Sequence, residues 1–358
     1  MISPITGRSQ FVSLGSDVRA VACGGEHTVV LLASGEAMAL EIHASNIASW
    51  RTLRPAPAAG EEAVRSIGAG AGHTLLVGER GTLWTAAVVD HPRGPGETSA
   101  EHYQFQNCLL GRRAEDGRHH ECGEVTALRP ALALSADGGG YHSLVLTHAG
   151  SVFAFGLNQD GRLGLDDASF ADHDTPQPVP LPSGEIAIQV AAGGDYSLVL
   201  TESGALYVAG DYEAPICSAE ATGLEAIPSF CTRRITQISA GNEHCVALDE
   251  MGCVWSWATQ TDGAADFGDD KRWARDRRDV EMLSGGLLLR NKIDWPFVEP
   301  TLVTAHYPRI EAVAAGGLIS AAVGAWPHGA AETDLGAEVA APWVFFGGTE
   351  PAAALVVD

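Results

Sequence analysis

A repeated segment constrains this chain more than any other feature of its sequence. Each copy has an apolar stretch, a glycine turn, a second apolar stretch, another glycine turn and a third stretch with a large side chain. The five clearest copies begin at Val18, Val64, Ala131, Ile188 and Ile235. In each copy, eight positions separate the residue that closes the first turn from the glycine of the second, as from His142 to Gly150. Such a constant spacing indicates that strand register is repeated.

The stretches between the turns are short and rich in Val, Leu and Thr, which is typical of strands. Two weaker copies begin at Ile310 and Ala341, giving seven units. Units of this size cannot bury both faces alone, so they pack radially. We therefore predict an all-β fold, a seven-bladed β-propeller whose last blade is short or incompletely closed. It forms a single domain over residues 1–358, with inserts near 87–130, 211–234 and 258–309. The segment from Phe11 is interpreted as the strand that leads into the first copy.

The amino-acid composition excludes some classes of function. The chain has 45 acidic and 22 basic residues, a formal net charge of -23, so tight binding to a nucleic-acid backbone is not expected. Seven scattered cysteines form no CxxC pair and indicate reduced thiols. We find neither a secretory signal nor a run of apolar residues long enough for a membrane span, which favours the cytosol or nucleus.

Two local patterns could bind a ligand but are better explained as surface loops. Cys108, His119, His120 and Cys122 offer zinc-ligand atoms within one polar segment, but their spacing matches no standard zinc site. Residues 271–279, KRWARDRRD, are basic, yet internal and flanking aspartates dilute their charge. We find no phosphate loop, HExxH helix or GxSxG elbow, so we expect no metal, no cofactor and no catalytic activity of the chain's own.

The turns written GGEHT, AGHT and GYHS, together with FGLNQDGRLG over residues 155–164, resemble the regulator of chromosome condensation repeat. The resemblance extends from about Val18 to Asp358, interrupted by the inserts. It implies a seven-bladed propeller, in agreement with the count of repeats. The family's founding member is a nuclear exchange factor for the Ran GTPase that uses acidic and histidine side chains beside the glycine turns.

The resemblance also implies candidate partner-binding residues. By position these are Glu26, Tyr141, Asp195 and Glu243, with His142 and His244 adjacent to two of them. The three acidic residues occupy one equivalent position in three repeats, which places them on one rim of a propeller. A second interpretation is that these acids are ordinary solvated turn residues. The histidines, in turn, could stabilise the turn or the packing between blades.

These observations leave three hypotheses. The first is a non-enzymatic scaffold for protein–protein interaction. The second is a guanine-nucleotide exchange factor for a Ran-like GTPase. The third follows from the short final segment from Pro342, which resembles the alpha-tubulin-suppressor branch of the family. Members of that branch partner a small zinc protein in diphthamide and tRNA wobble-uridine modification.

Overall fold

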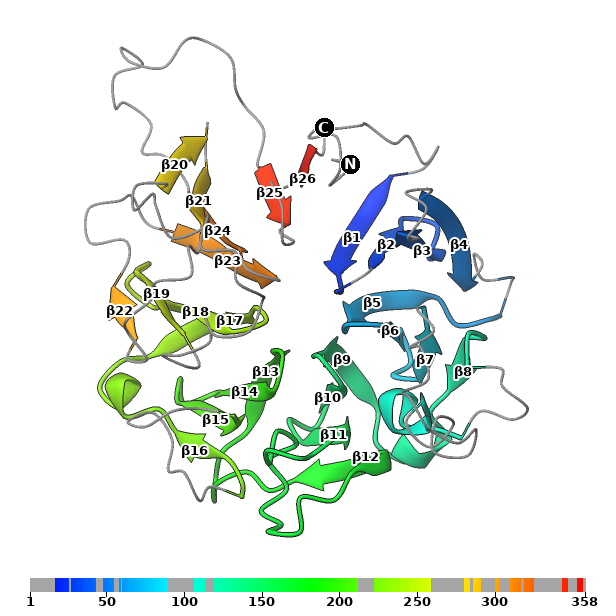
Figure 1. Ribbon diagram of the computed structural model, residues 1–358, viewed down its shortest axis with the longest axis horizontal. Coiled ribbons are helices and arrows are strands. Elements are labelled where there is room, and N and C mark those ends of the chain that lie inside the picture. Colours follow the sequence, from blue (N-terminus) through cyan, green and yellow to red (C-terminus); the bar gives the residue numbers. More distant parts are fainter. Residues whose placement is uncertain are drawn as a thin grey trace, which may run out of the picture.

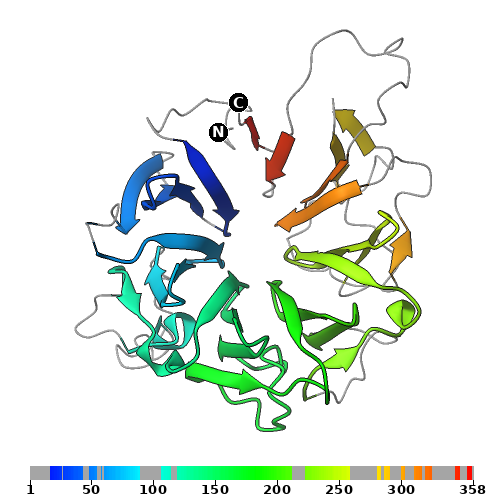
Figure 2. The ribbon, with the colours of Figure 1, turned by 180° about the vertical axis from the view of Figure 1, so that it is seen from behind.

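The fold is a ring of antiparallel sheets (Figures 1 and 2). The structure is a computed structural model. It describes residues 17–25, 27–42, 48–54, 58, 60–88, 106–113, 119–211, 222–258, 280–283, 286–290, 300–302, 310–316, 319–324, 343–346 and 353–356. These residues form six four-stranded sheets and one two-stranded sheet around a central axis. The predicted all-β propeller is confirmed, with blades 1 to 7 counted along the chain.

The first three strands of most blades follow the predicted repeat. The innermost strands of blades 1 to 6 are β1 (Val18–Cys23), β5 (Val64–Ala69), β9 (Ala133–Gly138), β13 (Ala187–Ala192), β17 (Ile235–Ala240) and β23 (Ile310–Gly316). The second strands are β2 (His27–Leu32), β6 (His73–Gly78), β10 (His142–Thr147), β14 (Tyr196–Thr201), β18 (His244–Asp249) and β24 (Ile319–Gly324). The third strands of blades 1 to 5 are β3 (Ala37–Ile42), β7 (Leu83–Ala87), β11 (Val152–Gly156), β15 (Leu206–Gly210) and β19 (Val254–Ala258).

The outermost strands are more variable, and several are short. In blades 1 to 5 they are β4 (Ala48–Arg54), β8 (Gly123–Glu124), β12 (His173–Val179), β16 (Glu225–Ala226) and β22 (Thr301–Leu302). Two 3-10 helices, η2 (Thr126–Leu128) and η3 (Pro228–Phe230), precede the innermost strands of blades 3 and 5. The segment from Phe11 that the sequence assigns to a first strand lies outside the described residues, and β1 begins at Val18.

Blade 6 takes its outer half from an earlier part of the chain. Strands β20 (Val280–Leu283) and β21 (Gly286–Arg290) lie between β19 and β22 in sequence, yet β21 pairs with β24. The resulting strand order is β20-β21-β24-β23. The segment over residues 258–309, predicted as an insert, therefore contributes strands to two blades. Among the described residues, blade 7 has two strands, β25 (Trp343–Phe346) and β26 (Ala353–Val356).

The hydrophobic core lies between neighbouring blades. Each of five buried clusters combines side chains from two adjacent sheets. Between blades 4 and 5, for example, Leu198 and Val208 pack with Ile238 and the fully buried Trp257. Because each sheet buries its faces only against its neighbours, the blades depend on one another for stability.

Polar side chains join the innermost strands, which form no continuous ladder around the axis. The Gln189 side chain accepts a hydrogen bond from the Ile238 N–H at 3.0 Å and donates to the Ile238 carbonyl at 2.8 Å. The Asp137 carboxylate accepts one from the Ala192 N–H at 3.0 Å. Gln237 likewise accepts from the Val313 N–H at 2.9 Å. These bonds satisfy backbone groups that would otherwise be buried without partners.

Candidate functional site

Two kinds of connection share one face of the ring. Because successive strands of a blade are antiparallel, the turn from first to second strand and the connection from third to fourth strand lie on the same side. Backbone hydrogen bonds join them: the N–H groups of Val88, Leu157 and Asp211 donate to the carbonyls of Gly72, Tyr141 and Asp195 at 2.8, 2.9 and 3.0 Å. We call this side the first-turn face, defined by turn residues 24–25, 70–72, 139–141, 193–195 and 241–243.

The first-turn face brings together three of the predicted partner-binding residues. Tyr141, Asp195 and Glu243 each precede the second strand, in blades 3, 4 and 5. Tyr141 is 38% exposed and the Asp195 side chain is 53% exposed, whereas Glu243 is partly buried. Glu26, at the same position in blade 1, lies outside the described residues. Of the three acidic residues expected on one rim, the two that can be placed, Asp195 and Glu243, lie on this face.

Asp195 and Glu243 interact electrostatically across the boundary between blades 4 and 5. The pKa of Glu243 is raised, first by burial and second by the negative charge of Asp195, while a hydrogen bond from the Asn242 side chain lowers it. The backbone also joins these turns, since the Gly194 N–H donates to the Asn242 carbonyl at 2.9 Å. Two carboxylates thus share a negatively charged patch at this point of the rim.

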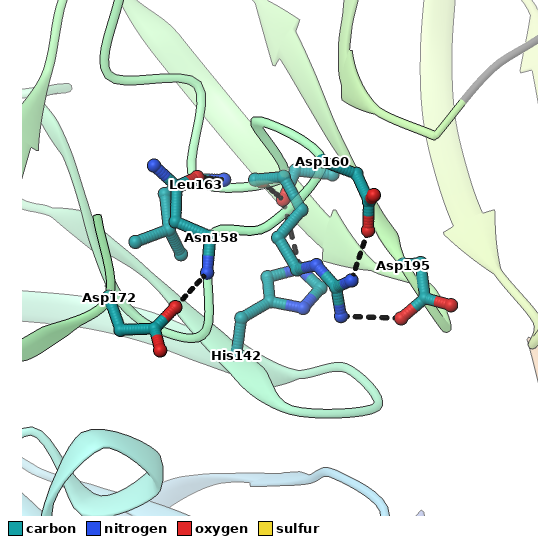
Figure 3. A network of polar contacts seen from close by, with 8 residues as sticks. His142, Asn158, Asp160, Leu163, Asp172 and Asp195 are labelled. Carbon is teal, nitrogen blue, oxygen red and sulfur yellow. Dashed lines mark hydrogen bonds and ion pairs between the residues drawn. The ribbon is translucent and has the colours of Figure 1, made fainter. Parts of the chain in front are cut away.

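A buried arginine organises the acidic patch (Figure 3). The Arg162 guanidinium forms ion pairs with both Asp160 and Asp195. Its side chain is only 5% exposed, whereas those of the two aspartates are 44% and 53% exposed. One desolvated cation therefore fixes two carboxylates that remain accessible.

The loop that carries Arg162 is itself held by hydrogen bonds (Figure 3). The Asn158 side chain accepts from the Leu163 N–H at 3.0 Å, and the Asn158 N–H donates to Asp172 at 2.8 Å. Sequence reasoning did not single out Asp160 or Arg162, although both lie in the FGLNQDGRLG motif. The only local signal in the sequence was that Arg162 follows Asp160 by two positions. The ion pair of Arg162 with Asp195, in the next blade, depends on the tertiary fold.

The histidines of the repeat join adjacent blades. The Nε2 atoms of His27, His73 and His142 lie 3.0, 2.9 and 3.0 Å from hydroxyl oxygens of the next blade. Those hydroxyls belong to Thr74, Ser143 and Ser197, each the second residue of its strand. The interpretation that these histidines stabilise the packing between blades is confirmed.

His142 and His244 are the two histidines that the sequence placed among candidate partner-binding residues. Their exposed fractions are 0% and 1%, so both rings lie inside the ring of blades rather than on its surface. Burial lowers the pKa of His142 to about 3, with smaller contributions from the charges of Arg162 and His73. The His142 side chain is buried beneath the first-turn face, so it cannot contact a partner directly.

Blade 4 uses tyrosine where blades 1, 2, 3 and 5 use histidine. The Tyr196 hydroxyl lies 2.9 Å from the Gly241 carbonyl and 2.6 Å from the His244 carbonyl. At the position of the acceptor hydroxyl, blade 5 has Cys245, which is fully buried. The longer tyrosine reaches backbone oxygens instead, so the contact between these blades does not need a side-chain hydroxyl.

Of the two patterns considered as ligand sites, the structure describes the four residues of the first, Cys108, His119, His120 and Cys122. Cys108 is buried, and the His120 Nδ1 atom lies 3.2 Å from the Ala87 carbonyl. In the part of the chain that the structure describes, no three His, Cys, Asp or Glu side chains are arranged to hold a metal ion. Residues 271–279 lie outside that part. No helix among the described residues has the length and apolar character needed to cross a bilayer.

Comparison with known proteins decides the family. The family model for the regulator of chromosome condensation (RCC1) repeat matches residues 149–200, which include the Arg162 loop and Asp195. The chain contains an RCC1 repeat and is an RCC1-like propeller. Two solved structures share its fold. Prp20p from Saccharomyces cerevisiae aligns with a TM-score of 0.61 at 19% identity, over 87% of this chain and 70% of Prp20p. Human WBSCR16 aligns with a TM-score of 0.60 at 16% identity, over 87% of this chain and 88% of WBSCR16.

Sequence similarity to curated RCC1 relatives is local. The bovine secretion-regulating guanine nucleotide exchange factor is 34% identical over 131 residues, which is 34% of this chain and 27% of that protein. The aligned region thus spans about a quarter of the relative's length.

Proposed function

We propose that this RCC1-repeat propeller is a non-enzymatic scaffold that binds a protein partner through its first-turn face. The observation that carries the proposal is the acidic patch of Asp160, Asp195 and Glu243, organised by the buried Arg162. Tyr141 adds an exposed aromatic ring in the neighbouring blade. Glu26 occupies the equivalent position in the first repeat of the sequence. His142 and His244 contribute by supporting the turns from within the ring.

The chemistry of the patch favours a basic partner surface. Asp160 and Asp195 are half exposed while their guanidinium partner is buried, so the carboxylates can accept further hydrogen bonds from lysine or arginine. Because Arg162 already holds them in place, little side-chain entropy is lost on binding. The strong negative net charge of the chain would also steer a basic partner toward it.

Charge reversal tests the binding face. We expect Asp195→Lys and Glu243→Lys to weaken partner binding by about 2 kcal/mol each, because they place a cation opposite basic groups of the partner. Glu202→Lys is the matched control, since it makes the same charge change in an exposed turn on the opposite face. A partner captured from native lysate would be purified and its affinity measured for all variants at two salt concentrations. Equal affinities for Asp195→Lys and Glu202→Lys would exclude this face.

A second candidate is guanine-nucleotide exchange on a Ran-like GTPase. The bovine relative is named as an exchange factor, and the structure of Prp20p was described together with its binding to Gsp1p and histones. Exchange would require this face to bind the nucleotide-free GTPase more tightly than the nucleotide-bound form. Release of fluorescent GDP from Ran should then accelerate with the chain and return to the basal rate with Asp195→Lys. No acceleration by the parent protein would leave the scaffold as the remaining proposal.

The alpha-tubulin-suppressor alternative, with a small zinc protein as partner, rests on the sequence of the final segment alone. None of the contacts described above favours it, and the charge-reversal experiment covers it because the purified partner would be identified directly.

A further inference from the structure

The turns from second to third strand lie on the side of the ring opposite the first-turn face, because successive strands of a blade are antiparallel. The residues that precede the innermost strands lie there too. Backbone hydrogen bonds join the two kinds of segment, since the N–H groups of His148 and Glu202 donate to the carbonyls of Leu132 and Ile186 at 3.0 and 2.8 Å. We call this side the second-turn face, defined by the residues that precede β9, β13 and β17 and by turn residues 79–82, 148–151, 202–205 and 250–253.

Exposed apolar side chains are concentrated on the second-turn face. The described part of the chain exposes five large apolar side chains, and one of them, Tyr141, lies on the first-turn face. The other four are Leu132, Ile186, Ile188 and Met251. Leu132 and Ile186 are 52% and 48% exposed, and Ile188 lies at a register shift in β13, two positions after Ile186. Apolar side chains grouped on one face are typical of an interaction site.

Leu132 and Ile186 occupy equivalent positions in blades 3 and 4, and each covers a turn glycine of the preceding blade. A Cβ at Gly81 would lie 2.7 Å from the Leu132 Cβ, and a Cβ at Gly150 would lie 2.2 Å from the Ile186 Cγ2. Leu132 is also bonded through its carbonyl to the turn over residues 148–151, which contains Gly150. The two apolar residues therefore contact this turn from opposite sides. We call Leu132 and Ile186 the apolar pair.

Unpaired carboxylates flank the apolar pair. Glu79 belongs to the turn that Leu132 covers, and Glu202 is joined to Ile186 by the backbone hydrogen bond. Both glutamates are exposed, and within the described residues neither side chain has an ion-pair or hydrogen-bond partner.

The arginines next to these glutamates have other partners. Arg80 pairs with the buried Glu62 at 3.6 Å. Arg234 donates to the carbonyls of Ser203 and Glu202 at 2.9 and 2.6 Å. The carboxylates of Glu79 and Glu202 thus remain open to a cation from outside the chain.

The charge on this face favours a basic partner over a second copy of the chain. With a formal net charge of -23, two copies repel each other, and an interface between them here would add further unpaired carboxylates. A partner with apolar side chains and basic residues would bury the first against the apolar pair and place the second beside the glutamates. An apolar centre with a charged rim is the usual arrangement of a protein interface.

We propose that the second-turn face binds a protein segment in which apolar side chains are flanked by basic residues. The apolar side chains pack against Leu132 and Ile186, and the basic ones pair with Glu79 and Glu202. Because the apolar pair already rests on turn glycines, little side-chain entropy is lost on binding. This site does not depend on the proposed use of the acidic patch, and with both sites the propeller can hold two proteins at once.

The probe for this site is a synthetic peptide in which lysines flank a pair of leucines, titrated with the full chain and followed by fluorescence anisotropy. We expect saturable binding that the double substitution Leu132→Ser and Ile186→Ser weakens at least about tenfold. Tyr141→Ser is the matched control, because it removes an exposed apolar side chain from the first-turn face, and it should bind the peptide as the parent does.

Two altered peptides separate the apolar from the charged contribution. One has serine in place of leucine and the other has glutamate in place of lysine, and each should bind at least about tenfold more weakly than the first peptide. If the serine peptide bound as tightly as the leucine peptide, net charge alone would account for the affinity and the proposal would be wrong.

The proposal is also overturned if the parent shows no saturable binding, or if the double variant keeps the parent's affinity. The thermal midpoint of each variant is measured without peptide, because a folding defect could imitate lost binding. Glu202→Lys is a second variant that leaves the apolar pair in place, and it should weaken peptide binding, whereas Asp195→Lys should not. This contrast keeps a failure here distinct from a failure of the first-turn face.

Discussion

Replacing Gly139 with alanine is expected to lower the free energy of unfolding by about 4 kcal/mol, since overpacking at a rigid site costs 1–3 kcal/mol and more where the backbone must move. A Cβ at this position would lie 2.3 Å from the Gly193 carbonyl of the next blade and 2.3 Å from the His142 ring. Neither neighbour can easily move. The ring is fully buried, and the Gly193 carbonyl accepts a hydrogen bond from the Gly140 N–H at 3.0 Å.

Gly184→Ala is the matched control for this substitution. Gly184 has a φ of 85° but no atom within 4 Å of the added Cβ, so alanine there introduces only backbone strain. That strain costs about 1–2 kcal/mol. Urea denaturation followed by circular dichroism compares the two variants with the parent. A loss for Gly139→Ala no greater than that for Gly184→Ala would show that the contact between the blades at this turn is not tightly packed.

The turns show why much of this fold was predictable from sequence. The eight-position spacing from His142 to Gly150 predicted a strand bounded by two turns, and β10 is followed by Gly150 with a φ of 73°. A positive φ of this kind strongly favours glycine, so the glycine in the sequence marks the position of the turn. Strand pairing within a blade is also local, because a short turn can connect only adjacent antiparallel strands.

Pairing between strands that lie far apart in the sequence could not be predicted from the spacing of the repeats. The pairing of β21 with β24 reverses the usual order of a blade, and nothing in the sequence of Gly286–Arg290 states which sheet edge it joins. Arg162 gives a similar case, since its burial and its ion pair with Asp195 arise only when blades 3 and 4 pack together. The candidate acids on the rim were found by their repeated position, whereas the arginine that pairs with one of them, Asp195, does not belong to that repeated pattern.

The histidine contacts also determine where a proton can bind. The Ser197 hydroxyl lies 2.6 Å from the Arg162 carbonyl, to which it must donate. Ser197 therefore accepts a hydrogen bond from His142 Nε2, at 3.0 Å, which requires the proton of the neutral ring to be on Nε2. Protonation of His142 must then occur at Nδ1, which is buried without a hydrogen-bond partner. The neutral form is thus built into the joint between blades 3 and 4.

Acidification is accordingly expected to destabilise the ring through its histidines. Burial lowers the pKa of His27 to about 4 and that of His142 to about 3, from 6.5 in the unfolded chain. Between these values the unfolded chain binds more protons, so stability is retained above pH 6.5 and falls as the pH decreases. Each histidine contributes about 1.4 kcal/mol per pH unit to that loss.

Asp137 acts in the opposite direction. Burial raises its pKa from 3.8 to about 6, outweighing the hydrogen bonds it accepts from the Ala192 and Gly138 N–H groups. The folded chain therefore binds more protons at this carboxyl between pH 6 and pH 3.8, and stability increases as the pH falls through that window. One such group offsets about one of the two histidines, at about 1.4 kcal/mol per pH unit.

Two substitutions separate these contributions. From pH 6 to pH 4.5, His142→Gln should reduce the loss of stability by about 2 kcal/mol relative to the parent, and Asp137→Asn should increase it by about 1.5 kcal/mol. Urea denaturation at the two pH values measures both differences, and an overall destabilisation of either variant does not affect them. If His142→Gln kept the parent's dependence on pH, a proton would be accommodated at the joint between blades, and the neutral Nε2–H tautomer would not be what holds blade 3 against blade 4.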